Sequence, residues 1–473
     1  MHIVADSDLF RRLAFDNPWW ELKVDTKIQF KNPPKRTFYN DFYKTYTDMP
    51  LGQILVLAGP LKAGKTVLLR QCVAGLIESG VHPSSVFYCN MTVPSYTATD
   101  VTTLFDMFCR RFHHDSNADI YILYDEIQYV KDWEAVLIKL SKIRPKARIV
   151  AAVSSGAPAI TSGLTTHEGQ ISTFVLPPLT FLEFLRFRET EKRLFGDIAD
   201  KMALQSNVIS ALNAEFYRYI NFGGFLEGII ISKEGTPAPT FIRDGVSDQV
   251  LHKDLASLHG INDAQELNRL FAVLAFNTAR EVTMDGLAKM VGIAKNTLRK
   301  YLDYLESAFL IRRLPRVDRD GKRFQRAVSF KVYLTAPCLY AALYAPVSKD
   351  NQLFQRLAEN ALVGQFLGTP EMDNLAYASW RGGSIDLLIM NPDTDIPDHI
   401  YEIDWANRYG RPGKGPDELV SFVECTNRKA KTYILTGDIA RPASMRSIEL
   451  TLTPIALYAY WLERGAPLQL TKF

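Results

Sequence analysis

The pattern of apolar and polar positions between residues 51 and 178 is that of alternating strands and helices. Short apolar runs bounded by turn-forming residues are typical of buried strands, and longer stretches with apolar residues at helical spacing are typical of amphipathic helices. Because strands that alternate with helices form a parallel sheet, we expect such a sheet with helices on its faces. The expected helices lie at 66–79, 100–112 and 132–143, and the expected strands at 54–58, 85–91, 120–124, 148–153 and 173–176.

From about residue 178 to residue 310 the pattern becomes mainly helical. Three helical segments follow in close order at the end of this region, LNRLFAVLAFN, VTMDGLAKMVG and NTLRKYLDYLESAFLI, with a short GIAK turn between the last two. Two helices joined by so short a turn are typical of a helix-turn-helix, and the basic stretch that follows suits the wing of a winged helix. Earlier helices are expected at 180–188, 189–205, 208–221 and 241–257.

From about residue 336 the chain has the pattern of a small α/β module. A helix at 352–367 is expected ahead of strands in AYASW, SIDLLIM, HIYEID and KTYILTG, with a further helix at 417–427. The changes of pattern divide the chain into five parts. The first is an aromatic and basic segment (1–50) that packs on the second, an α/β core (51–178). A helical part (179–258), a winged helix with a basic wing (259–335) and a second α/β module (336–473) follow.

Composition places the chain among soluble globular proteins. It has 473 residues, of which 47% are hydrophobic and 23% charged, so a disordered protein is excluded. No apolar run reaches the roughly 18 to 20 residues that span a bilayer, and the N-terminus lacks the apolar region of a signal peptide. The five cysteines are widely spaced and form no CxxC pair, which argues against a disulfide framework or a zinc knuckle. We therefore expect a cytoplasmic protein without a membrane partner.

The strongest chemical signal is GPLKAGKT at residues 59–66, which fits the pattern G-x-x-x-x-G-K-[ST]. It follows a predicted strand and opens a predicted helix, the setting that a phosphate-binding loop requires. Backbone N–H groups of such a loop attract phosphate oxygens, while Lys65 reaches the β- and γ-phosphates and the Thr66 hydroxyl binds Mg²⁺. The predicted cofactors are ATP and Mg²⁺, and the residues expected to line the ATP site are Gly59, Pro60, Leu61, Lys62, Ala63, Gly64, Lys65, Thr66 and Val67.

Two further strand ends carry polar residues that suit nucleotide hydrolysis. In IYILYDEIQ, Asp125 is expected to hold Mg²⁺ and Glu126 to deprotonate the attacking water; a plain helix cap is the alternative. In RIVAAVSSG, a hydroxyl of Ser154 or Ser155 can sense the γ-phosphate or position water; a plain turn is the alternative. The predicted catalytic residues are therefore Lys65, Glu126 and Ser154, and the predicted metal ligands are Thr66 and Asp125.

Charge is distributed unevenly along the chain. The 55 basic and 52 acidic residues give a net charge of +3, which argues against a protein that coats nucleic acid. Residues 311–331, however, carry eight basic and two acidic residues, a local charge of +6. Such a wing can contact the phosphates of DNA or RNA; a lid packed on the nucleotide domain is the alternative. The residues proposed for nucleic-acid contact are Arg312, Arg313, Arg316, Arg319, Lys322 and Arg323, with Lys295, Asn296, Arg299 and Lys300 on or just before the second helix.

The C-terminal module holds three acids in a suggestive order, with Glu359 on a predicted helix and Asp386 and Glu402 on predicted strands. A helix Glu, then an Asp, then Glu-x-Lys is the arrangement of a metal-dependent restriction-type nuclease, in which the acids bind Mg²⁺ and the Lys polarises water. Here Asp404 stands where that Lys is expected. The sequence favours a non-catalytic remnant, unless the fold brings in Lys414 or Lys429.

Taken together, these segments resemble an AAA-type family of ATP-binding proteins from bacteria and archaea. The resemblance covers nearly the whole chain and rests on NPWW, the GKT loop, a strand ending in DEIQ, the Ser-Ser pair, LPPLTFLEF and YINFGGFLE. It implies a P-loop AAA-type parallel-sheet domain, a helical lid with a winged helix, and a small restriction-nuclease-like α/β domain at the C-terminus. It also implies ATP binding, slow hydrolysis and a switch-like role similar to that of signal-transduction ATPases.

The chain departs from this family at three points. Leu226 replaces an expected Pro, Gln170 replaces an expected Arg, and the Lys two residues after Glu402 is missing. The missing Arg removes an expected cationic contact, so Arg186 or Arg188 is a candidate for the γ-phosphate arginine. The Trp19–Trp20 pair is expected to be a packing anchor.

These signals together predict a Mg²⁺-dependent ATP-binding and ATP-hydrolysing AAA-type ATPase that acts as a nucleotide-controlled conformational or assembly switch. AAA-type sites often take an arginine from a neighbouring copy, so an ATP-dependent homo-oligomer is expected. Two alternatives stay open. The first is a metal-dependent enzyme that cleaves nucleic acid under ATPase control, and the second is a nucleotide-gated binding protein with little turnover.

Overall fold

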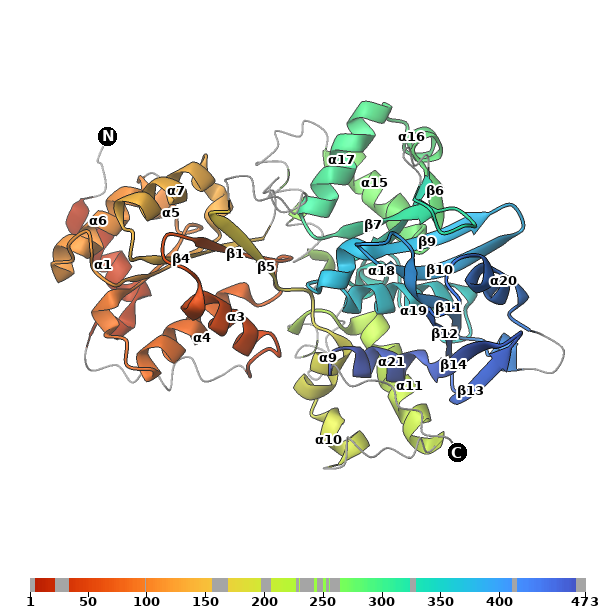
Figure 1. The fold of residues 1–473 in the computed structure, drawn as a ribbon. Helices are drawn as coiled ribbons and strands as arrows, with labels where there is room; N and C mark the ends of the chain where they lie inside the picture. The colour runs from red at the N-terminus through yellow and green to blue at the C-terminus, as the bar shows by residue number, and fades with distance from the viewer. Residues whose placement is uncertain are drawn as a thin grey trace. The chain divides into compact units, whose positions relative to one another are not determined.

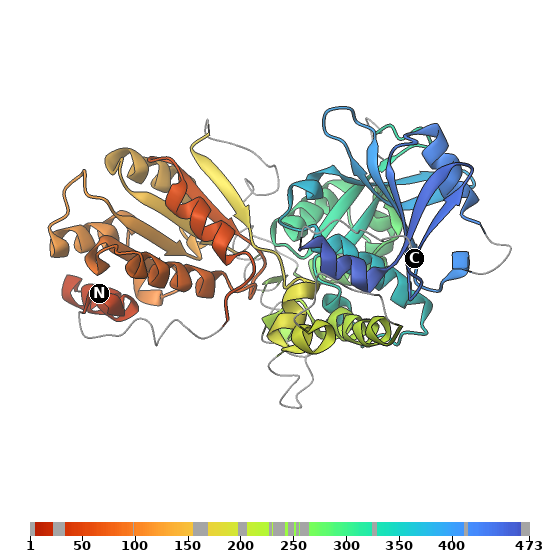
Figure 2. The ribbon, with the colours of Figure 1, turned by 60° about the horizontal axis from the view of Figure 1, so that its bottom comes forward.

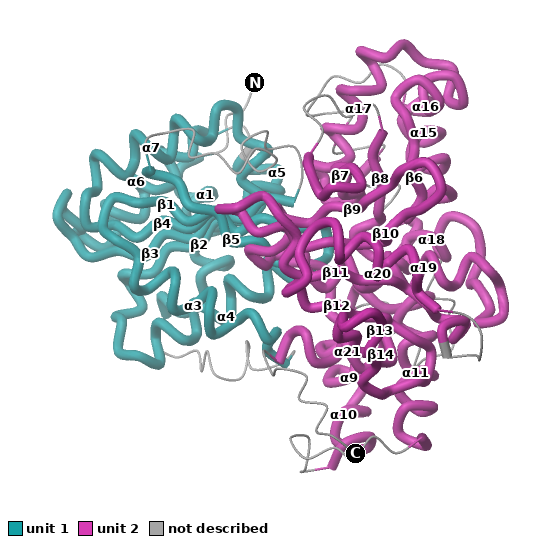
Figure 3. The backbone as a smooth tube through the Cα atoms, turned by 45° about the vertical axis from the view of Figure 1, so that its right-hand side comes forward, with its two compact units in different colours: residues 1–176, 257–260 teal, residues 177–256, 261–473 magenta. Residues whose placement is uncertain are grey.

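The computed structural model describes residues 5–21, 34–97, 99–154, 169–196, 206–226, 264–323, 329–410 and 415–464, with a few single positions between 229 and 255. The chain forms two compact units, one built mainly from the residues up to Leu176 and the other mainly from Pro177 onward (Figure 3).

The first unit is built on a five-stranded sheet in which every neighbouring pair runs parallel. The strand order is β2-β3-β4-β1-β5, so β1 lies between β4 and β5, and β2 lies at one edge. The carboxyl ends of all five strands meet at one edge of such a sheet, where α/β proteins bind ligands. The strands are β1 (Ile54–Ala58), β2 (Val86–Asn90), β3 (Tyr121–Asp125), β4 (Arg148–Val153) and β5 (Ile171–Val175).

Helices cover both faces of this sheet (Figures 1 and 2). On one face, α3 (Tyr39–Asp48) and α4 (Lys65–Glu78) contribute to a core with the inward residues of β1, β2, β3 and β4. On the other face lie α6 (Val101–Phe112) and α7 (Trp133–Ile143). Burying each Leu or Phe of these helices stabilises the fold by about 1.5–3 kcal/mol. Shorter elements complete the unit: α1 (Asp6–Asp16), η1 (Pro18–Trp20), η2 (Pro83–Ser85), α5 (Pro94–Thr97) and η3 (Ile127–Tyr129).

The second unit is built on a mixed sheet with the strand order β13-β14-β12-β11-β10-β9-β7-β8-β6. Its strands come from both sides of residue 335, because β7 pairs in parallel with β9, Arg316 opposite Tyr377. The basic segment and the C-terminal module therefore share one sheet. The strands are β6 (Glu281–Thr283), β7 (Ile311–Val317), β8 (Ser329–Leu334), β9 (Leu375–Trp380), β10 (Gly383–Met390), β11 (Pro397–Asp404), β12 (Lys431–Thr436), β13 (Arg441–Met445) and β14 (Ile448–Pro454).

The helices of the second unit are tied to one another by buried polar contacts. Gln365 donates to the Tyr219 hydroxyl at 3.0 Å, and the Val347 N–H donates to the Asn221 side chain at 2.7 Å. These bonds join the helical part around residue 220 to the C-terminal module. The helices are α9 (Phe181–Phe187), α10 (Thr190–Phe195), α11 (Ser206–Phe222), α15 (Ala264–Phe276), α16 (Met284–Val291), α17 (Lys295–Ser307), α18 (Cys338–Leu343), α19 (Gln352–Gln365), η5 (Pro370–Asn374), η6 (Arg408–Gly410), α20 (Asp417–Cys425) and α21 (Ile455–Leu462).

The parallel sheet predicted from the apolar runs is confirmed, with β5 beginning two residues earlier than expected. The pattern did not predict β13, β14, α18 or α21. The helix expected at 189–205 is described only as α10, and most of the helix expected at 241–257 lies outside the described residues. In the described part of the chain, every helix is too short or too polar to cross a bilayer.

Candidate nucleotide site

The GKT loop connects the end of β1 to the start of α4. Gly59 follows β1, and a side chain there would come within 2.2 Å of the Leu176 carbonyl oxygen, so only glycine fits. Gly64 caps α4 with a φ of 93°, a conformation that glycine adopts without strain. The loop therefore brings the N-terminus of a long helix to the carboxyl edge of the sheet, where an anion is favoured.

The side chain of Lys65 lies within the loop. It is only 3% exposed, and its Nζ donates to the carbonyl oxygens of Gly59 and Pro60, both at 2.9 Å. The loop thus holds a cation close to its own backbone. Phosphate oxygens are stronger acceptors for an ammonium group than these neutral carbonyls.

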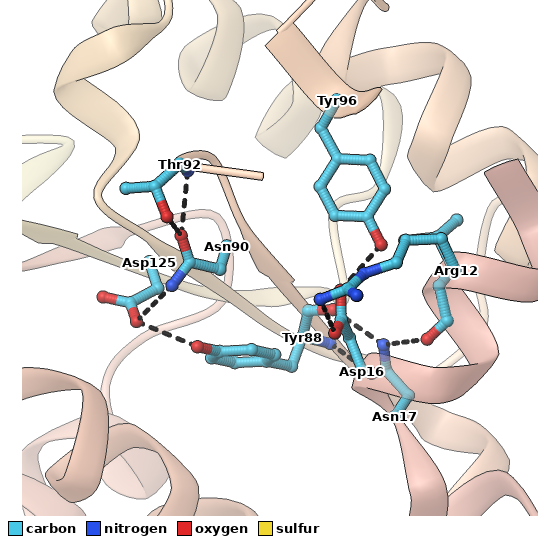
Figure 4. A network of polar contacts seen from close by, with 9 residues as sticks. Arg12, Asp16, Asn17, Tyr88, Asn90, Thr92, Tyr96 and Asp125 are labelled. Atoms are coloured by element: carbon cyan, nitrogen blue, oxygen red, sulfur yellow. Dashed lines mark hydrogen bonds and ion pairs between the residues drawn. The ribbon is translucent and has the colours of Figure 1, made fainter. Parts of the chain in front are cut away.

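The carboxylate of Asp125, at the end of β3, is fully buried and receives three hydrogen bonds on one oxygen. Its Oδ2 accepts from the Thr66 hydroxyl at 2.7 Å, the Tyr88 hydroxyl at 2.9 Å and the Asn90 amide at 3.3 Å (Figure 4 shows the bonds from Tyr88 and Asn90). Its Oδ1 is buried and has no hydrogen-bond partner among the described residues. Burial, and then the charge of Glu126, raise the pKa of Asp125, while the bonds from Thr66 and Tyr88 oppose this rise.

This arrangement fits a Mg²⁺ ion. Mg²⁺ prefers oxygen ligands, and a buried carboxylate oxygen without a partner is costly unless something positive meets it. The unpartnered Oδ1 of Asp125 and the hydroxyl oxygen of the neighbouring Thr66 are therefore the two oxygens suited to bind the ion.

Glu126 is held by the two polar residues that flank it in space. Its Oε1 accepts from the Ser154 hydroxyl just after β4, and its Oε2 accepts from the Gln128 amide. The Glu126 backbone has a φ of 54°, which is unusual for a residue other than glycine and is concentrated at functional sites. Glu126 makes no side-chain capping bond to η3. Ser155 lies outside the described residues.

Sequence reasoning missed Tyr88 and Asn90 as partners of Asp125. Asn90 stands at the carboxyl end of β2, so the reasoning applied to Ser154 would also have identified it. Tyr88 offered no such signal, because its hydroxyl reaches Asp125 from within an apolar strand.

The NPWW segment closes the free edge of β2. The Asn17 side chain bonds both backbone groups of Tyr88, donating to its carbonyl at 2.9 Å and accepting from its N–H at 2.8 Å. The ring N–H groups of Trp19 and Trp20 both donate to the Val86 carbonyl, at 3.1 and 2.9 Å. Trp20 also stacks on Phe108. The tryptophan pair is a packing anchor, as expected, and the segment satisfies groups that an edge strand leaves unpaired.

The C-terminal acids gather around a lysine that the sequence pattern had placed in another part of the chain. From β8, Lys331 Nζ lies 2.8 Å from Glu359 Oε1, 3.1 Å from the Asp386 carbonyl and 3.6 Å from Asp386 Oδ1. Lys429 is exposed, and Lys414 lies outside the described residues. Within the described ranges, no group of three or more acids, histidines or cysteines is placed to hold a metal ion.

The charges in this cluster depend on one another. Burial disfavours the charged form of Lys331, but the attraction of Glu359 and Asp386 outweighs it and raises the pKa of Lys331. Burial raises the pKa of Glu359 to about 7, and burial together with Asp386 raises that of Glu402. Lys331 therefore contacts two acids, Glu359 and Asp386, while the third, Glu402, is influenced by Asp386 and by the charge of Arg408.

Asp404, which stands where the nuclease pattern has a lysine, has a structural task. It is fully buried and accepts hydrogen bonds from the N–H groups of Arg408 and Tyr409 and from Arg408 Nε, at 2.9 to 3.0 Å. Its carboxylate thereby holds the turn that follows β11. A lysine has no acceptor and could not make these bonds.

The basic segment at residues 311–331 is less positive in the fold than in the sequence. Most of the arginines proposed for nucleic-acid contact have acidic partners within the unit: Arg312 with Asp373, Arg313 with Asp303 and Glu306, Arg316 with Glu281, and Arg323 with Asp395. Arg319 donates to the Ser421 hydroxyl. Arg326 lies outside the described residues. A residue count overstates the charge of this surface because the compensating acids come from elsewhere in the chain.

The two arginines considered for the γ-phosphate are also paired. Arg186 bonds Glu191 at 2.8 Å and Arg188 bonds Glu215 at 3.2 Å, all within the second unit.

Comparison with known families identifies the first unit. A family model for an AAA domain matches residues 52–185, and a model for a domain of unknown function matches residues 213–351. With the GKT loop on a parallel sheet, the first match shows that the chain carries a P-loop AAA-type domain of nucleotide-binding ATPases. The second match spans residues 258 and 335, where the sequence pattern suggested boundaries.

Individual relatives are distant. An uncharacterised protein of Haemophilus influenzae strain Rd is 27% identical over 277 residues, which cover 57% of this chain and 64% of that protein. The chain thus spans less than two-thirds of this relative.

Solved structures with some similarity are DnaA from Aquifex aeolicus bound to AMPPCP and the Aeropyrum pernix ORC1 protein in complex with DNA. The DnaA match has 14% identity and a TM-score of 0.30 and covers 59% of this chain and 90% of that chain. The ORC1 match has 13% identity and a TM-score of 0.28 and covers 64% and 90%. Neither likeness is high enough to carry an argument about function.

Proposed function

We propose that the first unit binds ATP with Mg²⁺ and hydrolyses it, with Glu126 as the general base. The observation that supports this most is a convergence at the carboxyl edge of the sheet. Lys65 follows β1, Asp125 and Glu126 stand at the end of β3, and Ser154 follows β4. These residues supply a phosphate-binding cation, a carboxylate suited to Mg²⁺ and a second carboxylate suited to water, the set that phosphoryl transfer to water requires.

Each residue has a separate task in this proposal. Lys65 exchanges its loop carbonyl partners for phosphate oxygens and stabilises the charge that develops on them. Thr66 and Asp125 hold the metal, which when bound neutralises the phosphates and orients them. Glu126 accepts the proton of the attacking water, and Ser154 keeps the Glu126 carboxylate in place.

Hydrolysis then serves as a switch in conformation or assembly. Binding and release of a charged nucleotide at a loop, a helix terminus and two strand ends change the contacts of all these elements together. This role requires no nucleic-acid partner. The acidic residues paired with the arginines of the basic segment argue against nucleic-acid binding there. Assembly is tested by light scattering with and without ATP, in which an ATP-dependent increase in mass is expected.

The decisive experiment compares binding with turnover. Glu126→Gln is expected to bind ATP with wild-type affinity while its rate of phosphate release falls by about 10²- to 10⁴-fold. Lys65→Ala is expected to abolish binding. Glu78→Gln, a change at an exposed glutamate at the end of α4, is the matched control and should leave both quantities unchanged.

Two results would contradict the proposal in different ways. Wild-type turnover in Glu126→Gln would remove the assignment of the general base. Tight ATP binding by the wild type with phosphate release near zero would favour a nucleotide-gated binding protein.

A further inference from the structure

Tyr88 occupies an unusual place, on the edge strand of the first sheet and in contact with the carboxylate proposed to bind Mg²⁺. Its side chain is 1% exposed, and its hydroxyl lies 2.9 Å from Asp125 Oδ2 (Figure 4). In the β2–β3 register, Tyr88 stands opposite Leu123 and Asn90 stands opposite Asp125. The Tyr88 hydroxyl therefore reaches Asp125 diagonally across the strand pair, from a position on β2 two residues before the one that lies opposite Asp125.

The backbone of Tyr88 is fixed on both sides. On the inner side β2 pairs with β3, and on the outer side the Asn17 carboxamide replaces a missing neighbouring strand by bonding both the N–H and the C=O of Tyr88. Trp19 packs edge-on against the Tyr88 ring, with the ring centroids 6.5 Å apart. A side chain held in this way can direct its hydroxyl with little freedom, so its hydrogen bond costs little ordering entropy.

The three bonds on Asp125 all converge on Oδ2, while Oδ1 has no partner among the described residues. Donors on one oxygen fix the orientation of the carboxylate and favour its charged form. Of the three, the Thr66 hydroxyl is itself expected at the metal, and the Asn90 contact is the longest. Tyr88 is thus a buried donor to Asp125 that is not itself a proposed metal ligand, and its bond is shorter than that of Asn90.

We infer that Tyr88 is a positioning residue for Mg²⁺: its hydroxyl holds the Asp125 carboxylate so that Oδ1 is presented to the cation, and Asn17 of the NPWW segment holds Tyr88. The inference rests on the proposed function of this site. It assigns to the NPWW segment a role in metal affinity in addition to packing.

Tyr88→Phe tests this directly because it removes the hydroxyl and keeps the ring. The affinity for a fluorescent ATP analogue is measured over a Mg²⁺ titration, and separately in EDTA. We expect the Mg²⁺ concentration at half-effect to rise roughly tenfold, the size of one hydrogen bond to a charged group, with no change in EDTA. Saturating Mg²⁺ should restore wild-type affinity.

Tyr124→Phe is the matched control. Tyr124 precedes Asp125 on β3 and is equally buried, but its hydroxyl has no hydrogen-bond partner among the described residues. Its loss should leave the Mg²⁺ dependence unchanged. Asn17→Ala is a second variant that keeps the Tyr88 hydroxyl and loosens its backbone, and it should shift the Mg²⁺ dependence in the same direction.

The outcomes separate this inference from the function on which it rests. If the wild type binds no nucleotide, the proposed function fails, and the inference fails with it. Suppose instead that the wild type binds nucleotide, while Tyr88→Phe and Asn17→Ala fold and show the same Mg²⁺ dependence as the wild type. In that case only the inference is overturned. An equal loss of affinity with and without Mg²⁺ would also overturn it, since that indicates a purely structural effect.

Discussion

Replacing Lys331 by Met tests whether the acid cluster of the second unit depends on its lysine. Met is similar in length and has no charge, so packing is largely kept while the cation is lost. The lysine and glutamate side chains are 10% and 6% exposed, and their charged atoms lie 2.8 Å apart. Removing one partner of so buried a pair leaves the other without compensation, and a carboxyl group in that position avoids the cost of an unmet charge by taking up a proton where the pH allows it.

The cost should depend on pH, and its direction follows from Glu359. In the folded chain, burial raises the pKa of Glu359 from 4.5 to about 7, while Lys331 opposes this rise. A raised pKa means that the folded chain binds this proton more tightly than the unfolded chain. The resulting stabilisation is therefore fully present below a pH of about 4.5 and is lost as the pH rises through about 7. Without Lys331 the pKa of Glu359 rises further, so ionisation near pH 8 becomes more costly.

The assay is urea unfolding followed by circular dichroism at two pH values. Lys331→Met is expected to lose about 1 kcal/mol more near pH 8 than near pH 5. Near pH 5 Glu359 is protonated in either protein, whereas near pH 8 the variant keeps the proton on Glu359 at a cost of about 1.4 kcal/mol for the one pH unit above 7. Lys429→Met, at an exposed lysine, should change stability by less than about 0.5 kcal/mol at both. An equal loss at the two pH values, or a larger loss near pH 5 than near pH 8, would refute the reasoning.

Two further predictions concern packing and charge. Trp20→Ala should lower the free energy of unfolding by about 3–5 kcal/mol, because Trp20 stacks on Phe108 and donates a hydrogen bond to the edge of β2. Thermal unfolding measures this change, and a loss below about 1 kcal/mol would contradict the packing role. Arg313→Ala should destabilise the protein by about 1–3 kcal/mol, because it leaves the partly buried Glu306 without its cation. The same variant should leave any affinity for a DNA duplex, measured by fluorescence anisotropy, unchanged; a clear loss of affinity would restore Arg313 as a phosphate contact.

Much of the nucleotide site could be predicted because its residues follow local rules. The spacing of Gly59, Gly64 and Lys65 is set within one turn between a strand and a helix. Asp125 and Ser154 were predictable as polar residues at the ends of apolar strands, and all parallel strands place these ends at one edge. The hydroxyl of Tyr88 and the carboxamide of Asn17 were not predictable, because a tyrosine inside an apolar strand is more often only a packing residue.

The second unit shows where local pattern ceases to suffice. Its apolar runs correctly placed strands in SIDLLIM, HIYEID and KTYILTG, since alternation and turn residues are properties of neighbouring positions. The boundary at residue 335, in contrast, separated β7 and β8 from a sheet to which they belong. Strand pairing between distant segments depends on tertiary packing that a window of sequence does not contain.

The sequence by itself determined the loop, the parallel sheet and the acids at its edge, because each depends on residues only a few positions apart. Only the tertiary structure decided which charges meet. In the fold, Lys331 contacts Glu359 and Asp386, and Asp404 accepts hydrogen bonds that stabilise the turn after β11. The arginines of the basic segment pair with acids from other elements. The physical reason is that a charge interacts through space over a few ångströms whatever its distance along the chain, so its effect is set by the fold that surrounds it.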